Sequence, residues 1–131
     1  MPGFCPDEGE AFFATMVINN TTTDRGTGLE LGLFTGTPTE STTYSTLSKV
    51  TSNLSPLTYT LADGTWTGSA DSRSYVERTF TASATIAGVT GYYIATTGTT
   101  KRLIAVEIDP NGPYTLNVND TYKITPTITI A

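Results

Sequence analysis

Two different hydrophobic periods follow one another along this chain of 131 residues. After Asp7, Phe12 and Met16 repeat at a spacing of four, as do Phe13 and Val17, which predicts a short amphipathic helix. Asp7 is placed to cap the N-terminus of that helix. A helix of this length is marginal in isolation, so we expect its apolar stripe to pack against a sheet or against another chain.

From Leu29 onward apolar residues tend to recur at every second position, which is typical of half-buried strands. The turn at Asp63–Gly64 predicts a tight hairpin, with Trp66 in the core of its returning strand. Residues 36–45 show no period and predict a surface loop. Pro126 has no amide donor, which predicts an edge strand or a bulge. The predicted strands are residues 29–34, 57–61, 65–67, 74–84, 91–95, 102–108, 114–118 and 122–130.

About eight short strands, separated by turn signals and without alternating helices, predict an all-β fold. We expect an antiparallel β-sandwich, jelly-roll or immunoglobulin-like, with a short N-terminal helix or arm. The expected division is an N-terminal arm with the helix and a loop over residues 1–28, and the sandwich domain over residues 29–131. The strand order stays open at this point.

Composition supports this fold and excludes two classes of partner. Threonine clusters such as residues 21–23 supply much of the polar surface, and threonine is favoured on a pleated, half-exposed face. The net charge of −5, with only Lys101 and Arg102 adjacent among the basic residues, argues against binding nucleic acid or an anionic membrane. The N-terminus has no signal-peptide pattern, so we expect a product made in the cytoplasm.

The side chains that carry most enzyme chemistry are scarce. The chain has no histidine and a single cysteine, Cys5, which argues against a Cys–His nucleophile, a zinc cluster and an internal disulfide. The nearest carboxylate pairs, such as Glu107 with Asp109, are explained as surface charge. Asp109 and Asn111 offer oxygen ligands for calcium, but turn chemistry alone explains these two residues. We therefore expect a protein that is not an enzyme and that needs no cofactor.

Tyr92 and Tyr93 are consecutive in a predicted strand and therefore point to opposite faces. We expect one of them in the core, while the other is exposed as an interface anchor. A sugar-binding platform would use the same exposed ring, together with Tyr75 if the strands align.

Several segments resemble a group of small virion proteins of tailed bacteriophages, including phages of cyanobacteria and other aquatic bacteria. The resemblance covers most of the chain, from about Glu8 to Ile130. It is most specific at residues 91–94, 112–116 and 124–130. The segments that carry it are Glu-Ala-Phe-Phe at 10–13, Leu-Glu-Leu-Gly-Leu-Phe-Thr at 29–35, Gly-Thr-Trp-Thr at 64–67, Gly-Tyr-Tyr-Ile-Ala at 91–95, Asn-Gly-Pro-Tyr-Thr-Leu at 111–116 and Lys-Ile-Thr-Pro-Thr-Ile-Thr-Ile at 123–130.

This resemblance implies a structural role in a symmetric particle. The size of the chain and the lack of a long shaft favour a cement or decoration protein on the capsid surface, which clamps neighbouring major capsid subunits. Its implied partners are the major capsid protein and copies of itself, with a homotrimer as the expected assembly. The alternative is a tail, baseplate or fibre component with a receptor- or carbohydrate-binding role.

The hypothesis for the interface begins with apolar residues near the N-terminus, in the segment 1–17. A free terminus with several aromatic side chains can reach onto a neighbouring subunit. The exposed member of the tyrosine pair would add to that contact. The candidate interface residues are Phe4, Phe12, Phe13, Met16, Tyr92 and Tyr93.

Overall fold

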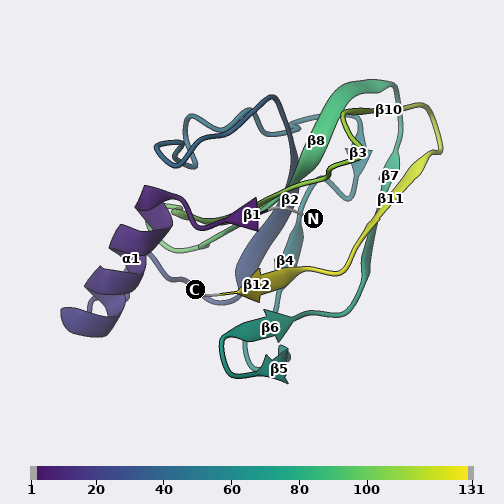
Figure 1. Cartoon of the computed structure of the whole chain (residues 1–131). Helices are drawn as coiled ribbons and strands as arrows, with labels where there is room; N and C mark the ends of the chain where they lie inside the picture. The colour runs from purple at the N-terminus through teal and green to yellow at the C-terminus, as the bar shows by residue number, and fades with distance from the viewer. Residues whose placement is uncertain (1–2, 130–131) are drawn as a thin grey trace.

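The computed structural model describes residues 3–129 and shows a mainly antiparallel β structure with one helix, α1 (Asp7–Ile18) (Figure 1). The strands are β1 (Gly3–Phe4), β2 (Leu29–Thr35), β3 (Leu54–Ser55), β4 (Tyr59–Leu61), β5 (Thr67–Ser69), β6 (Ser72–Ser74), β7 (Arg78–Ala82), β8 (Ile86–Ala95), β9 (Leu103–Ile108), β10 (Tyr114–Leu116), β11 (Thr121–Ile124) and β12 (Thr127–Thr129). The expected fold class, an all-β sandwich-like fold with a short helix, is confirmed.

The first layer is a six-stranded sheet in the order β1-β9-β8-β2-β4, with β10 pairing to β8. At its centre, β2 and β8 run antiparallel, so that Leu31 lies beside Ile94 and Gly32 beside Tyr93. Nearly every residue of these two strands is buried in this region. This central pair therefore has protein on both of its faces.

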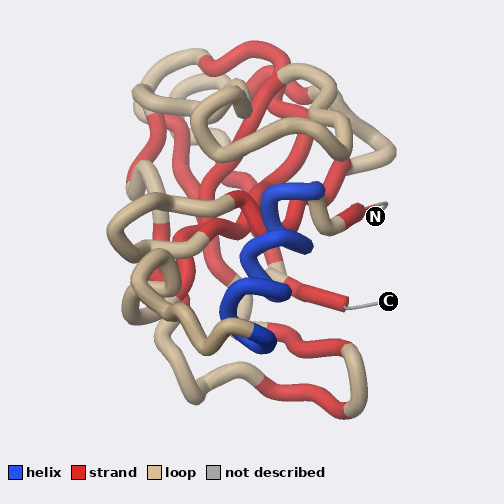
Figure 2. Tube along the Cα trace, turned by 90° about the vertical axis from the view of Figure 1, so that its left-hand side faces the viewer, coloured by secondary structure: helices blue, strands red, loops and turns tan. Residues whose placement is uncertain are grey.

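The second layer consists of two short three-stranded sheets, β11-β7-β3 and β12-β6-β5. The chain passes from β6 into β7 and from β11 into β12, so the two sheets continue one another. The amide of Tyr75 donates to the carbonyl of Pro126 over 2.8 Å and links them at the junction. Figure 2 shows β5 and β6 extending below the rest of the molecule, on the side where α1 ends.

Two hydrophobic clusters bury the two faces of the first sheet. The larger cluster lies between the layers and includes Leu31, Leu33, Phe80 and Ile94. The smaller cluster lies on the other face and includes Phe34, Leu47, Tyr93, Leu103 and Val106, with Tyr44 packed against it. The loop between β2 and β3 supplies Tyr44 and Leu47, so part of the predicted surface loop, residues 36–45, covers the second cluster.

The predicted hairpin around Asp63–Gly64 is wrong. β4 pairs with β2, and β5 pairs with β6, so the two segments on either side of the turn enter different sheets. Pairing with β2 buries Leu61 completely, which a two-stranded surface hairpin could not do. Trp66 accordingly lies before β5 and is only partly buried.

The predicted strand over residues 122–130 is divided at Pro126 into β11 and β12. β12 is an edge strand, as the missing amide donor of Pro126 suggested. Ile130, the last residue of the predicted strand, lies outside the described residues.

The N-terminal segment is joined to the first sheet at two points. β1 pairs with β9, and α1 packs against the same strand. The N-cap of α1 is Pro6 and not Asp7, so Asp7 is the first residue of the helix, and its amide donates to the Glu40 carbonyl. Met1 and Pro2 of the predicted arm lie outside the described residues, and the division at residue 28 stays a prediction. Within residues 3–129 no helix is long and apolar enough to cross a membrane.

Candidate functional site

A buried carboxylate holds the β2–β3 loop onto the first sheet. Glu30 on β2 is 7% exposed. Its Oε2 accepts hydrogen bonds from the hydroxyls of Tyr44 and Tyr93, each over 2.8 Å, and its Oε1 accepts one from Lys101 Nζ over 2.7 Å. Gly32 leaves room for this arrangement, since a Cβ there would collide with the Tyr93 ring. We call Glu30, Tyr44, Tyr93 and Lys101 the Glu30 cluster.

The protonation states in the Glu30 cluster favour a structural role. Burial by itself would raise the pKa of Glu30, but the hydrogen bonds from Lys101, Tyr93 and Tyr44 hold that pKa below its usual value. Burial, and then the hydrogen bond to Glu30, raise the pKa of Tyr93 and of Tyr44. The carboxylate thus stays charged and both tyrosines stay protonated donors at neutral pH. Each of these groups is already engaged in a hydrogen bond within the cluster.

Both members of the tyrosine pair are buried, Tyr92 to 3% and Tyr93 to 2% exposure. The expectation that one of them is exposed is therefore wrong, because the second layer covers one face of β8 and the β2–β3 loop covers the other. The Tyr92 hydroxyl accepts a hydrogen bond from the Thr127 amide over 3.3 Å, and burial raises its pKa to about 12. Neither ring is available as an interface anchor or as a sugar platform.

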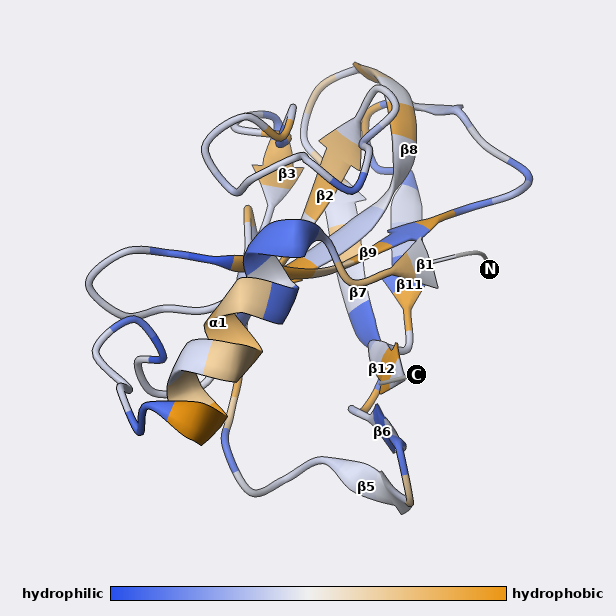
Figure 3. Cartoon of the chain, turned by 60° about the vertical axis from the view of Figure 1, so that its left-hand side comes forward, coloured by the Kyte–Doolittle hydropathy of each residue, from blue (hydrophilic) through white to orange (hydrophobic). Residues whose placement is uncertain are grey.

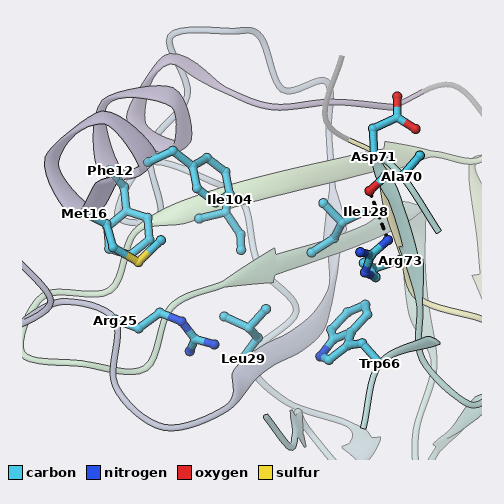
Figure 4. A pocket seen from close by; sticks show the side chains of 11 residues that line it. Phe12, Met16, Arg25, Leu29, Trp66, Ala70, Asp71, Arg73, Ile104 and Ile128 are labelled. Atoms are coloured by element: carbon cyan, nitrogen blue, oxygen red, sulfur yellow. Dashed lines mark hydrogen bonds between the residues drawn. The ribbon is translucent and has the colours of Figure 1, made fainter. Parts of the chain in front are cut away.

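An unfilled apolar groove lies between α1 and the β12-β6-β5 sheet (Figure 4). Its volume is about 430 Å³, within the range of about 300–1,000 Å³ that is typical of ligand sites. Helix α1 forms one wall, the β5–β6 hairpin forms the other, and β2 and β9 supply the floor. The apolar side chains that line it are Phe12, Phe13, Met16, Leu29, Trp66, Ile104 and Ile128.

Two arginines border this groove from opposite sides (Figure 4). Arg25 precedes β2 and pairs with Asp63 over 2.5 Å. Arg73 on β6 donates to the carbonyls of Ala70 and Ser72 over 3.1 and 2.9 Å. Among the ion pairs within residues 3–129, none includes Arg73. The groove thus combines apolar walls with the two guanidinium groups and with the carboxylate of Asp71, which also lines it.

The last turn of α1 extends the apolar surface beyond the groove. Val17 and Ile18 are 75% and 79% exposed, and Figure 3 shows this end of the helix in the hydrophobic colour. Val17 therefore does not pack against the sheet of its own chain, and its packing against another chain stays a prediction. Val17 lies four residues after Phe13, so it continues the helix flank that borders the groove.

Of the remaining predicted interface residues, three line this groove. Phe12 is buried, and Phe13 and Met16 are partly buried. Phe4 lies apart from them, packed against the smaller core cluster on the other face of the sheet. Sequence reasoning missed Arg73 and Ile128 as members of a site, because no local pattern places the β6 and β12 strands opposite α1.

The other candidate residues lie in turns or are partly buried. Asp109 Oδ1 accepts the Asn111 amide over 3.0 Å inside a turn, and its Oδ2 accepts the Tyr122 hydroxyl over 3.1 Å. Glu107 is half-buried, and this burial raises its pKa. Burial likewise raises the pKa of the partly exposed Cys5 thiol. In the described range, residues 3–129, no three His, Cys, Asp or Glu side chains gather in a way that could hold a metal ion.

Comparison of the chain with protein-family models, with curated proteins and with solved structures finds no match.

Proposed function

We propose that this protein is a virion structural protein of a tailed bacteriophage, and that it acts as a capsid cement protein clamping neighbouring major capsid subunits. The observation that carries the proposal is the unfilled apolar groove beside α1, together with the exposed Val17 and Ile18. An exposed apolar surface of this kind is typical of a site that another protein covers.

The chemistry of the groove fits protein contact better than catalysis. Its walls are phenylalanine, methionine, tryptophan and isoleucine, and aromatic residues and methionine are enriched at the centres of protein interfaces. Arginine at the border is also characteristic of such surfaces. A cement protein needs contact area, on the order of 1,200–2,000 Å² in total for each stable interface. Repetition of that contact over a shell stabilises the particle without any reaction.

Cryo-electron microscopy of the intact particle tests this proposal. We expect density for the chain on the outer surface of the shell, between capsid subunits, with the groove beside α1 covered by protein. Density at the tail tip or baseplate would contradict the cement role and favour the host-contact alternative. Absence of the chain from purified particles, measured by mass spectrometry, would contradict both.

A further inference from the structure

We propose that α1 and the β2–β3 loop open from the first sheet as one cooperative unit, and that the side chain of Glu8 couples them. Proteins open locally in segments that have few buried apolar contacts, and neighbouring segments often open together. The inference goes beyond the proposed function and does not depend on it. It concerns how one wall of the groove is linked to the cover of the smaller cluster.

Helix α1 is packed against the rest of the chain along one narrow strip. Of its twelve residues, all within the described range, only Gly9 and Phe12 are buried. Gly9 allows the helix to approach β9 closely, since a Cβ there would lie 2.8 Å from the Leu103 carbonyl oxygen. The groove runs along one flank of the helix, and a second hollow of about 280 Å³ lies along the other flank. The helix residues that border this second hollow are Glu8, Ala11, Phe12 and Thr15.

The side chain of Glu8 bonds the first turn of this loosely packed helix to two other parts of the chain. Its Oε2 accepts a hydrogen bond from the Tyr44 amide over 2.7 Å, and its Oε1 lies 3.6 Å from Arg102 Nη1. The Glu8 side chain is only 11% exposed, so the loss of either partner leaves a largely buried group unpaired, which is costly. Beside these contacts, the Asp7 amide donates to the Glu40 carbonyl over 2.8 Å. The start of α1 is therefore bonded to the β2–β3 loop at two points.

Tyr44 carries this connection from the helix to the sheet. Its amide donates to Glu8, while its hydroxyl donates to Glu30 on β2 over 2.8 Å. One loop residue is thus held by α1 at its backbone and by the first sheet at the end of its side chain. When α1 moves away, the Tyr44 amide loses its acceptor, and when the loop moves away, Glu8 loses a donor. Each opening therefore removes a contact that stabilises the other segment, and such coupling is reciprocal.

This link joins the two faces of the first sheet. Helix α1 is one wall of the groove, and the β2–β3 loop covers the smaller cluster on the opposite face. A molecule that displaces α1 would therefore also loosen the loop. Conversely, a firmly closed loop holds the wall of the groove in place.

Hydrogen exchange of the whole chain, resolved for individual amides, tests whether the two segments open together. Tyr44→Phe removes a hydroxyl that is bonded to β2 and not to α1. We nevertheless expect exchange at the α1 amides to quicken by about tenfold, the factor that corresponds to one lost hydrogen bond to a charged group. Unchanged exchange in α1 would overturn the proposal.

The matched control is Tyr93→Phe. It removes the other hydroxyl that donates to the same oxygen of Glu30, but Tyr93 lies in β8 and not in the loop. We expect this variant to leave exchange in α1 nearly unchanged. An increase in α1 exchange equal to that of Tyr44→Phe would come from a weakened Glu30 cluster and would overturn the link through Tyr44.

A double-variant cycle tests whether the link runs through Glu8. Glu8→Ala should quicken exchange in α1 and throughout the loop, whereas Glu10→Ala should leave the loop unchanged, because Glu10 is exposed and takes part in no ion pair within residues 3–129. In the Glu8→Ala background, Tyr44→Phe should affect α1 much less than it does alone, since only the bond between Asp7 and Glu40 still joins the segments. Equal effects of Tyr44→Phe with and without the Glu8 carboxylate would overturn the role assigned to Glu8.

Discussion

The two faces of the central β2–β8 pair are closed in different ways. On one face, the β2–β3 loop brings Tyr44 and Leu47 onto Phe34 and Tyr93, and the buried Glu30 fixes the loop through hydrogen bonds. On the other face, the second layer fills most of the space but leaves the groove beside α1. On the loop face, the β2–β3 loop of the same chain covers the apolar cluster. On the groove face, apolar side chains at the end of α1 stay exposed.

The difference shows that a polar segment can close a core more completely than an apolar helix does. The loop is rich in threonine and serine, yet a single tyrosine gives it an aromatic contact with Tyr93, at 6.0 Å between ring centroids. The amide of Tyr44 also donates to Glu8 Oε2 over 2.7 Å, which ties the loop to the start of α1. The helix, in contrast, directs part of its apolar surface away from the core. We infer that stability is concentrated on the loop face and binding on the groove face.

The largest expected effect comes from removing one aromatic ring from each face. Tyr93→Ala should lower the free energy of unfolding by about 3–5 kcal/mol, because it opens a cavity in a fully packed cluster. Phe13→Ala should lower it by only about 1 kcal/mol, since Phe13 is partly exposed. Urea denaturation of both variants at the same low protein concentration measures the difference. Similar losses would contradict the contrast between the two faces.

A smaller effect is expected from neutralising the buried carboxylate. Glu30→Gln keeps the size of the side chain but removes its charge and turns one acceptor oxygen into an amide NH2, which cannot accept the hydrogen bond made at that position by Lys101 or by the two tyrosines. The expected loss is about 1–3 kcal/mol in the free energy of unfolding. Hydrogen exchange should also quicken at the amide of Tyr44, because the loop is then held less tightly. Unchanged protection at that amide would show that Glu30 does not hold the loop.

Much of the fold was predictable because it depends on local patterns. The alternation of Leu29, Leu31 and Leu33 predicted β2, and Tyr92 and Ile94 predicted β8. The turn chemistry at Asp109 and Asn111 was equally clear, and the Gly112 amide there donates to the Asp109 carbonyl over 3.0 Å. These signals depend on a few neighbouring residues, so they can be recognised without knowledge of the rest of the chain.

What the sequence did not reveal depends on contacts between distant segments. Alternation places Tyr92 and Tyr93 on opposite faces, but it does not show that both faces are covered. Likewise, a turn signal at Asp63–Gly64 cannot show that the strand before the turn, β4, pairs with β2 and not with the segment after the turn. The groove exists only because β6 and β12 lie opposite α1, and no spacing in the sequence relates Arg73 or Ile128 to Phe13.

Acid should reduce the stabilisation that the Glu30 carboxylate gives to the loop face. The pKa of Glu30 is lower in the folded chain than the value of about 4.3 expected when unfolded. The stabilisation by its carboxylate is therefore complete above that pH and is lost as the pH falls through the folded-state pKa. The difference in melting temperature between the natural chain and Glu30→Gln should thus shrink below about pH 4. A difference that stays constant from pH 7 to pH 3 would contradict this assignment.

The smallest effect is expected when a carboxylate is replaced by an amide near the groove. Asp63→Asn removes the partner of Arg25 in an ion pair whose side chains are 27% and 49% exposed. Exposed pairs contribute about 0–1 kcal/mol, since water screens the charges and both side chains lose freedom when they pair. The free energy of unfolding, measured in urea, should therefore change by less than it does for Glu30→Gln. Both variants exchange one carboxylate for an amide, and the two sites differ in burial and in the number of side chains that donate to the carboxylate. A loss at Asp63 as large as that at Glu30 would contradict the inference that stability is concentrated on the loop face.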